Sequence, residues 1–259
     1  MDRDAALAAF DTQLRNVARP SLGGGRFERV GKVIRCVSTA EDGWSGVEWS
    51  DLDESTADEV IAEQVAFFTG QSRTFEWKYY AYDKPANLPD RLRAAGLRPG
   101  EDEALMVAAV ADIPTDMPAP EGIELRLATD DAGLELARQV HDEVFGGDHS
   151  GMIASMRDRL REDPDALAVV LAMAGDQPVC ASRVDFHPGT DFASLWGGGT
   201  LPPWRRRGIY RAMVAYRTRM AADRGFSYLR TDALPPSRPI LEKLGFQRIS
   251  TTIPFTLPE

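Results

Sequence analysis

The sequence predicts an α/β (α+β) fold in two halves, and three features of the chain support this. Apolar residues alternate in some segments, as in strands, and recur at helical spacing in others. A proline-rich stretch with small and acidic residues, 111–122, is typical of a linker. The order of helices and strands before this stretch recurs near the C-terminus, which suggests an internal repeat. We therefore expect two domains, residues 1–116 and 117–259.

The second half shows the clearer pattern of secondary structure. Its first strand alternates at Ile123, Leu125 and Leu127, and the long helix before Gly225 has a suitable glycine to end it. Ser237 is a plausible N-cap of a short helix that Gly245 closes. The expected order is strand 123–129, helices around 134–144 and 153–160, strands 166–175, 178–186 and 192–201, helix 208–225, strand 227–234, helix 237–246 and strand 248–257.

The first half ends in a similar way. We expect a helix at 55–70, a strand at 75–83, a short helix at 87–97 and a strand at 103–110. When the two short helices are aligned, Gly96 matches Gly245 and Leu97 matches Phe246. A chance match of two common helix endings is the alternative to a repeat.

Composition limits the classes of function. The 259 residues are 43% hydrophobic and carry a net charge of −10, so a broad nucleic-acid or anionic-membrane surface is not expected. The longest apolar run, 166–174, is too short to cross a bilayer, and the N-terminus does not resemble a signal peptide. Cys36 and Cys180 lie in apolar runs, which predicts reduced core thiols, no metal site and a cytoplasmic protein. Frequent arginine and alanine suggest a bacterial source.

Three arginines stand where the long helix of the second half begins. Arg205, Arg206 and Arg207 lie at the positive end of the helix dipole, where a cation loses about 0.3–1 kcal/mol. The first N–H groups of a helix lack internal partners, and Gly208 would let an anion approach the backbone. The stretch therefore predicts a phosphate or pyrophosphate site. A solvated basic turn is the alternative.

The spacing Arg205-x-x-Gly208-x-Tyr210 resembles the (Q/R)-x-x-G-x-(G/A) acetyl-CoA loop of the GNAT acetyltransferase superfamily. Residues 240–246, ILEKLGF, resemble the closing motif of that family, and the element order of 122–259 is similar too. The resemblance implies a tandem of two GNAT-like domains. Each would have a mixed, central twisted sheet flanked by helices.

The resemblance also implies how acetyl-CoA would bind as cosubstrate. Backbone amides of the loop would hold its pyrophosphate, and strand 192–201 would splay from its neighbour near Gly199 to bind pantetheine and polarise the thioester carbonyl. Gly197, Gly198 and Gly199 suit a close approach, although a strand bulge without a ligand is an alternative. The cofactor-binding residues expected are Gly199, Thr200, Leu201, Arg205, Arg206, Arg207, Gly208, Ile209, Tyr210 and Ser237.

Two residues depart from the family pattern. Tyr210 replaces a small residue of the loop, and Leu241 replaces the tyrosine that often protonates the leaving thiolate. The asparagine that commonly precedes the closing motif is not evident, and Ser237 or Arg238 could take its role.

Attack by a primary amine, whose pKa is roughly 10.4, needs a base that removes a proton. Glu143 and Asp185 are the catalytic residues expected, and the sequence does not choose between them. His187, His149 and Asp191 are further candidates, whereas His141 on an apolar helix face is expected to be a packed residue.

We therefore expect an N-acetyltransferase that transfers the acetyl group of acetyl-CoA to a primary amine of a small-molecule acceptor. The alternative is an inactive GNAT-fold protein that binds CoA as a sensor or scaffold, and an arginine contact with nucleic acid is a weaker third. In the first half, Asp51, Asp53 and Glu54 would repel a pyrophosphate and favour a helix start capped through Ser55. That half is expected to bind no cofactor and to form one wall of the cleft. The oligomeric state, monomer or homodimer, stays open.

Overall fold

The computed structural model describes residues 1–21, 25–39, 43–71, 73 and 75–258. The chain forms two compact units, and each contains several segments of the sequence. The C-terminal unit comprises Met1, Met106–Thr231 and Pro239–Gln247; the N-terminal unit comprises Asp2–Leu105, Asp232–Arg238 and Arg248–Glu259. These units are defined by packing and do not follow one cut in the sequence. The division into domains 1–116 and 117–259 stays a prediction.

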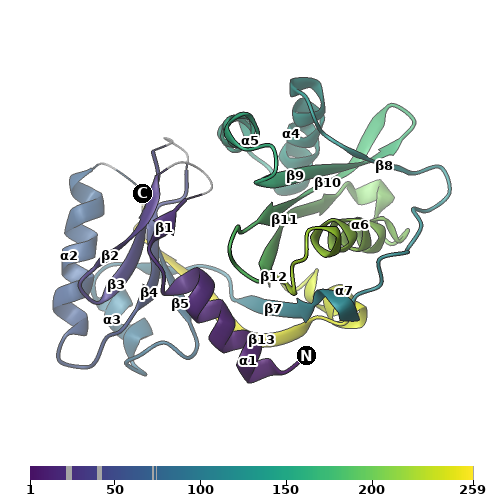
Figure 1. Cartoon of the computed structure of the whole chain (residues 1–259). Helices are drawn as coiled ribbons and strands as arrows, with labels where there is room; N and C mark the ends of the chain where they lie inside the picture. Colours follow the sequence, from purple (N-terminus) through teal and green to yellow (C-terminus); the bar gives the residue numbers. More distant parts are fainter. Residues whose placement is uncertain (22–24, 40–42, 72, 74, 259) are drawn as a thin grey trace. The chain divides into compact units, whose positions relative to one another are not determined.

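A mixed sheet forms the centre of the C-terminal unit (Figure 1). Neighbouring strands from β8 to β11 are antiparallel, whereas β12 runs parallel to β11. The strand order is β7 (Glu103–Ala109), β12 (Tyr228–Ala233), β11 (Phe192–Thr200), β10 (Gln177–Phe186), β9 (Leu167–Ala174) and β8 (Glu124–Leu127).

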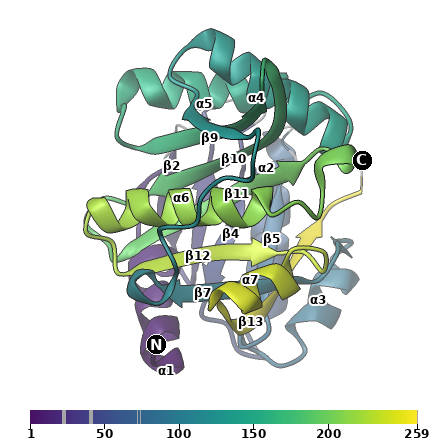
Figure 2. The same cartoon turned by 90° about the vertical axis from the view of Figure 1, so that its right-hand side faces the viewer.

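Helices cover both faces of this sheet (Figure 2). Leu167, Val169 and Leu171 of β9 pack against α4 (Asp131–Phe145) and α5 (Ser150–Glu162). The alternate residues Val170 and Ala172 pack against α6 (Ile209–Asp223), as the two-residue period of a strand requires. The predicted helices and strands of this half are therefore present. Two short 3-10 helices, η2 (Val110–Asp112) and η3 (Pro202–Trp204), and helix α7 (Arg238–Leu244) complete the half.

The strands of the N-terminal unit also run in mixed directions. Its strands run β1 (Arg19–Pro20), β2 (Arg26–Val30), β3 (Val33–Val37), β4 (Gly46–Ser50), β5 (Glu76–Tyr80) and β13 (Gln247–Thr256), with β6 (Arg98–Pro99) also beside β13. Only the β4–β5 pair is parallel among the pairs described in this unit. Trp77 and Val47 pack in one core with α2 (Ala57–Gly70) and α3 (Leu88–Ala94). Phe10 of α1 (Arg3–Phe10) contacts Tyr80.

The predicted repeat is confirmed by its elements and by their endings. Apart from the two-residue strand β6, the order α2-β5-α3-β7 recurs as α6-β12-α7-β13. Gly96 and Gly245 have φ of 93° and 109°, a left-handed region that favours glycine. In both helices the next residue donates back to a carbonyl in the last turn, Leu97 to Leu92 and Phe246 to Leu241, each at 3.0 Å. The two ends therefore share the Schellman geometry.

The last strand of each half of the sequence belongs mainly to the unit formed by the other half. β13, from the C-terminal end of the chain, pairs antiparallel with β5, with Thr252 opposite Tyr80 and Phe255 opposite Trp77. β7 lies next to β12. Sequence periodicity predicts a strand at each place but carries no information about which partner it takes.

Cys36 and Cys180 are both free and buried, as predicted. Burial raises the pKa of each thiol to about 11. Within the described part of the chain, the helices are too short or too polar to cross a bilayer.

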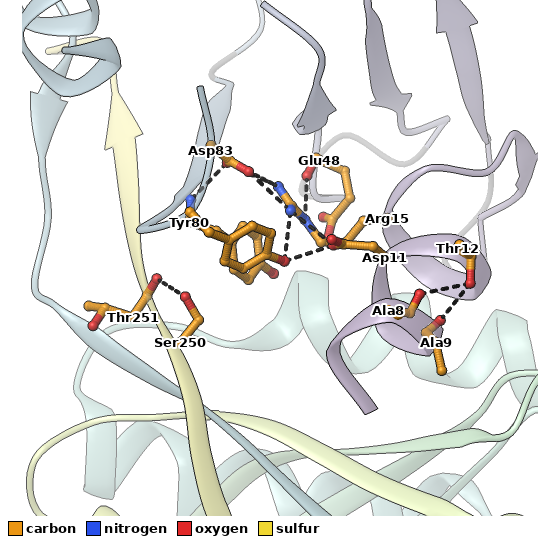
Figure 3. A network of polar contacts seen from close by, with 11 residues as sticks. Ala8, Ala9, Asp11, Thr12, Arg15, Glu48, Tyr80, Asp83, Ser250 and Thr251 are labelled. Carbon is orange, nitrogen blue, oxygen red and sulfur yellow. Dashed lines mark hydrogen bonds and ion pairs between the residues drawn. The ribbon is translucent and has the colours of Figure 1, made fainter. Parts of the chain in front are cut away.

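A buried arginine joins α1 and its π-helical extension η1 (Asp11–Arg15) to the sheet of the N-terminal unit (Figure 3). Arg15 is fully buried, and its guanidinium makes three hydrogen bonds of 3.1 Å to the Asp83 carboxylate. It also donates to the Glu48 carbonyl at 3.1 Å and lies 3.8 Å above the Tyr80 ring. A buried charge of this kind is tolerated only while its partners are present.

Replacing Arg15 tests how far this network stabilises the unit. We expect Arg15→Met to lower the free energy of unfolding by about 3–5 kcal/mol, because it leaves the Asp83 carboxylate buried without its countercharge. The matched control is Arg26→Met, which removes an arginine with a 70% exposed side chain from the same unit and should change stability by less than about 0.5 kcal/mol. Chemical denaturation measures both. Equal effects of the two substitutions would contradict the expectation.

Candidate functional site

The carboxyl half of β11 is irregular on both of its edges. Its parallel register with β12 runs from Phe192 opposite Tyr228 to Ser194 opposite Arg230, and β11 then continues to Thr200. On the other edge the register with β10 shifts between Ala181 and Arg183, so Gly197 and Gly198 form a bulge. The divergence expected at Gly199–Leu201 therefore begins earlier, after Ser194.

His141 of α4 fixes the bulge. Gly197 has a φ of 59°, and its carbonyl accepts a hydrogen bond of 2.9 Å from His141 Nε2. Since a peptide is planar and trans, the N–H of Gly198 points away from His141. Gly198 is exposed although Leu195 and Gly199 are buried. The bulge therefore presents backbone atoms to solvent in the middle of a buried strand.

The expectation that His141 is a packed residue is correct, and its ring also makes one polar contact, with the Gly197 carbonyl. Its ring is 3% exposed, and Nδ1 has no hydrogen-bond partner among the described residues. Burial lowers the pKa of His141 to about 4, although the bond to Gly197 opposes this. The imidazole is therefore neutral near neutral pH, with its proton on Nε2.

The loop before α6 has the backbone geometry of an anion cradle. Arg206 has a φ of 62°, a left-handed conformation that residues other than glycine seldom adopt, and Gly208 has a φ of 86°. Gly208 precedes the first turn of α6 without a side-chain cap in the described structure. The amides of Ile209 and Tyr210 are at the positive end of the helix dipole. Alternating left-handed residues of this kind form concavities that bind phosphate.

The loop arginines are exposed and are not used in ion pairs among the described residues. Arg205 donates from Nε to the Thr200 carbonyl at 3.0 Å, and Arg207 lies 4.7 Å above the Trp204 ring. Ser237 lies elsewhere, before α7. Its hydroxyl donates to the Leu234 carbonyl at 3.1 Å, and its role as an N-cap stays a prediction.

Tyr210, which replaces a small residue of the family loop, packs against the bulge. A Cβ atom added to Gly198 would lie 2.7 Å from Tyr210 Cε2. Burial raises the pKa of the Tyr210 hydroxyl. The bulky ring therefore fits because Gly198 has no side chain. The sequence does not show that these two residues are in contact.

The two expected catalytic carboxylates differ in their surroundings. Glu143 is on the exposed side of α4. Asp185 is 6% exposed and pairs with Arg159 at 3.1 Å and Arg183 at 3.2 Å. Burial raises the pKa of Asp185, but the two arginines outweigh this and hold it below its ordinary range. A carboxylate held in this way is a weak base, and the role of either residue stays a prediction.

The sequence did not predict the contact between Asp142 and His149 across the α4–α5 connection. Asp142, one residue after His141, accepts from the backbone N–H of His149 at 2.9 Å and lies 3.0 Å from its Nδ1. Phe145 is 51% exposed, and its ring lies 5.5 Å from that of His141. The glycines at 146 and 147 were the available signal, since they end α4 and let the chain turn back.

In the described part of the N-terminal unit, acidic residues precede α2 where arginines precede α6. Before α2, Asp53 accepts from the backbone N–H groups of Ser55 and Thr56 at 2.9 and 3.0 Å and pairs with Lys32 at 3.1 Å. Hydrogen bonds from Ser55 and Lys32 hold the pKa of Asp53 far below its ordinary range. The predicted cap through Ser55 was therefore wrong, because the carboxylate of Asp53 accepts instead. That this unit binds no cofactor stays a prediction.

Leu241 is buried at 1% exposure in α7, so the position of the family tyrosine is part of the core. The described residues contain no cluster of three or more His, Cys, Asp or Glu side chains that could hold a metal ion.

Known proteins resemble this chain in structure but not detectably in sequence. No model of a protein family and no curated protein matches this sequence. A GCN5-related N-acetyltransferase from Kribbella flavida is similar over 99% of this chain and 94% of its own, with a TM-score of 0.72 and 15% identity. This chain has the GNAT fold. A tandem GNAT protein from the clavulanic acid biosynthesis pathway matches 90% of this chain and 83% of its own, with a TM-score of 0.61 and 11% identity.

A third GNAT structure, a GCN5-related N-acetyltransferase from Sphaerobacter thermophilus, covers 87% of this chain and 76% of its own, with a TM-score of 0.62 and 16% identity. These matches extend over both halves of the chain. The predicted fold class, two GNAT-like halves with mixed sheets flanked by helices, is therefore confirmed.

The contact of Gly198 with Tyr210 can be tested by a double-mutant cycle. Gly198→Ala should lower the free energy of unfolding by about 1–3 kcal/mol, since the new methyl overlaps the Tyr210 ring. In a Tyr210→Ala background the same change should be close to neutral. Gly70→Ala, where no atom lies within 4 Å of the added carbon, is the matched control and should not destabilise. An unchanged cost of Gly198→Ala in both backgrounds would disprove the contact.

The lowered pKa of His141 predicts a pH dependence of stability. The unfolded chain binds a proton at His141 with the ordinary pKa of 6.5, and the folded chain binds it only near pH 4. Stability is therefore complete above pH 6.5 and falls towards pH 4, by roughly 3 kcal/mol through this residue. His141→Phe should remove this part of the pH slope, measured by denaturation across the range. An identical slope in both proteins would contradict the assignment.

Proposed function

We propose that this protein is an acetyl-CoA-dependent N-acetyltransferase that acetylates a primary amine of a small molecule. The observation that carries the proposal is the combination of two features at one end of β11. The strand diverges from β12 and has an exposed bulge at Gly198. The next helix, α6, starts soon after this strand, without a side-chain cap and directly after three arginines. The GNAT fold supports this reading.

The residues of the loop fit a pyrophosphate. The left-handed Arg206 and Gly208 turn successive backbone N–H groups towards one concavity, and Arg205, Arg206 and Arg207 add positive charge around it. When bound, acetyl-CoA supplies an activated acetyl thioester. β11 beyond Ser194 offers backbone groups for the pantetheine arm, because its edge there lacks the register with β12.

The bulge would carry the electrostatic part of the reaction. His141 holds the Gly197 carbonyl, so the Gly198 N–H is fixed in the opposite direction before any substrate arrives. A preorganised N–H of this kind stabilises charge that develops on a carbonyl oxygen in the transition state. Leu241 cannot donate a proton to the leaving thiolate, which therefore takes its proton from water or from the protonated base.

The proposal extends to the partners and to the setting of the protein. We propose that the acceptor is a free small-molecule amine, that neither nucleic acid nor a membrane is a partner, and that the protein works in the cytoplasm of a bacterium as a monomer or homodimer. The net charge of −10 supports this choice against nucleic acid.

Calorimetric titration of acetyl-CoA tests the function. We expect micromolar binding at one site per chain, weakened about tenfold or more in Arg207→Glu, since a charge-assisted contact is replaced by repulsion. Arg219→Glu, the same charge reversal at an exposed position later on α6, is the matched control and should bind as the wild type does.

Absence of acetyl-CoA binding to the wild type would overturn the proposal, as would equal losses in the two variants. If binding is confirmed, thiol release is measured with a panel of polyamines, aminoglycosides and amino acids. Binding without turnover of any amine would favour the alternative of a CoA-binding sensor or scaffold, for which the buried Leu241 is the supporting observation.

A further inference from the structure

The connection between α4 and α5 returns a histidine to the last turns of α4. Gly146 and Gly147 both have positive φ, 74° and 81°, which ends α4 and reverses the chain. His149 then occupies the N-cap position, directly before the first residue of α5. Its side chain is only 25% exposed, although it lies in a loop.

Asp142 orients this histidine. One oxygen of the carboxylate, Oδ1, accepts from the backbone N–H of His149 at 2.9 Å and from the ring Nδ1 at 3.0 Å. The other oxygen pairs with Arg138, which also binds Glu135 at 2.6 Å. Burial raises the pKa of Asp142, but its bonds to His149 and the charge of Arg138 hold it below the ordinary range.

This geometry determines which nitrogen can act. An ionised carboxylate is only an acceptor, so in the neutral imidazole of His149 the proton is on Nδ1 and the lone pair is on Nε2. The same arrangement of carboxylate and imidazole fixes the tautomer of catalytic histidines.

Ring contacts place His149 beside the bulge. Its ring centroid lies 5.8 Å from that of His141 and 6.2 Å from that of Phe145. His141 binds the Gly197 carbonyl, and the edge of the Phe145 ring would lie 3.0 Å from a Cβ added to Gly199. The rings of His141 and Phe145 therefore lie at the bulged part of β11, and the ring of His149 lies beside both of them.

The other titratable groups near the bulge are less suited to take a proton. His141 has its Nε2 committed to Gly197, and burial lowers its pKa to about 4. Asp185 is paired with two arginines, and Glu143 is on the exposed side of α4.

We propose that His149, oriented by Asp142, is the general base that removes the proton from the acceptor amine. This rests on the proposed function. Nε2 takes one proton from the amine as the nitrogen bonds to the acetyl carbon, and the carbon–sulfur bond breaks with its electron pair on sulfur. The thiolate then takes a proton from the imidazolium or from water. Amine and thioester thus give amide and thiol, with no other reactant.

Substitutions of the two residues test the role. His149→Gln should lower kcat for thiol release by about 10²-fold or more, whereas KM for acetyl-CoA stays unchanged. Asp142→Asn should give a smaller loss, because Nδ1 no longer has an anionic partner. Arg161→Gln, at a 65% exposed side chain of α5, is the control and should retain most activity. Normal activity in His149→Gln, or an equal loss in the two variants, would overturn the proposal.

The pH profile separates a base from a merely structural residue. The acidic limb of kcat/KM should be present in the wild type and absent in His149→Gln, since an unprotonated imidazole is required. An unchanged acidic limb would contradict the proposal. The titratable groups that face His149 are Asp142 and His141 of α4. Arg138 pairs with Asp142, Glu135 and Asp148 act on Arg138, and Arg183 of β10 acts on His141.

Failure of this inference can be distinguished from failure of the proposed function. Absence of calorimetric acetyl-CoA binding refutes both. Binding with full activity of His149→Gln refutes only the role of His149. If the wild type turns over no amine, the role of His149 is tested instead by basal hydrolysis of acetyl-CoA and by the nuclear magnetic resonance signals of the three histidines. We expect His149 to be protonated on Nδ1 and to shift between bound CoA and bound acetyl-CoA. Unshifted His149 signals would overturn the proposal.

Discussion

The hydrogen bond from His141 to the Gly197 carbonyl is the interaction on which the candidate site depends. It joins α4 to the irregular part of β11 and sets the direction of the Gly197–Gly198 peptide. From α6, the buried Arg217 donates to the Arg183 carbonyl at 2.9 Å, on the strand opposite the bulge. Two helices therefore hold the region where regular sheet pairing stops. A bulge supported in this way remains fixed although it lacks part of the ladder.

This support explains how the departures from the family motif are tolerated. Tyr210 is too large for the position that it occupies in the loop, yet its ring lies over Gly198, where the bulge leaves no side chain. The bulk of Tyr210 is therefore accommodated by a glycine that is 12 positions away in the sequence but adjacent in space. Glycines at three successive positions of a strand would otherwise weaken it.

Much of the fold could be predicted because its signals are local. The helix ends at Gly96, Gly225 and Gly245 need only a glycine that tolerates positive φ, and the sequence shows each one. The exchange of β7 and β13 could not be predicted, since an apolar strand fits either sheet equally well. Nor did periodicity reveal α1 or the strands β2–β4, whose charged and apolar residues do not follow a simple alternation.

For the site, the sequence predicts the arginine loop but not the arrangement of side chains around the bulge. Asp142 and His149 are seven positions apart, and only the turn at Gly146 and Gly147 brings them together. Asp185 looked equally suitable as a base because the sequence does not show that Arg159 of α5 and Arg183 of its own strand both pair with it. Protonation behaviour depends on such neighbours, so it cannot be assigned from residue type.

The two halves share a topology but differ in the one place where a cofactor would bind. At the start of α6 the backbone N–H groups and three arginines leave an uncompensated positive charge. Before α2 the carboxylate of Asp53, itself held by Lys32, accepts from the backbone N–H groups of the turn residues Ser55 and Thr56. A helix start that has its own carboxylate repels a second anion. We therefore expect an anion to be favoured before α6 and repelled before α2.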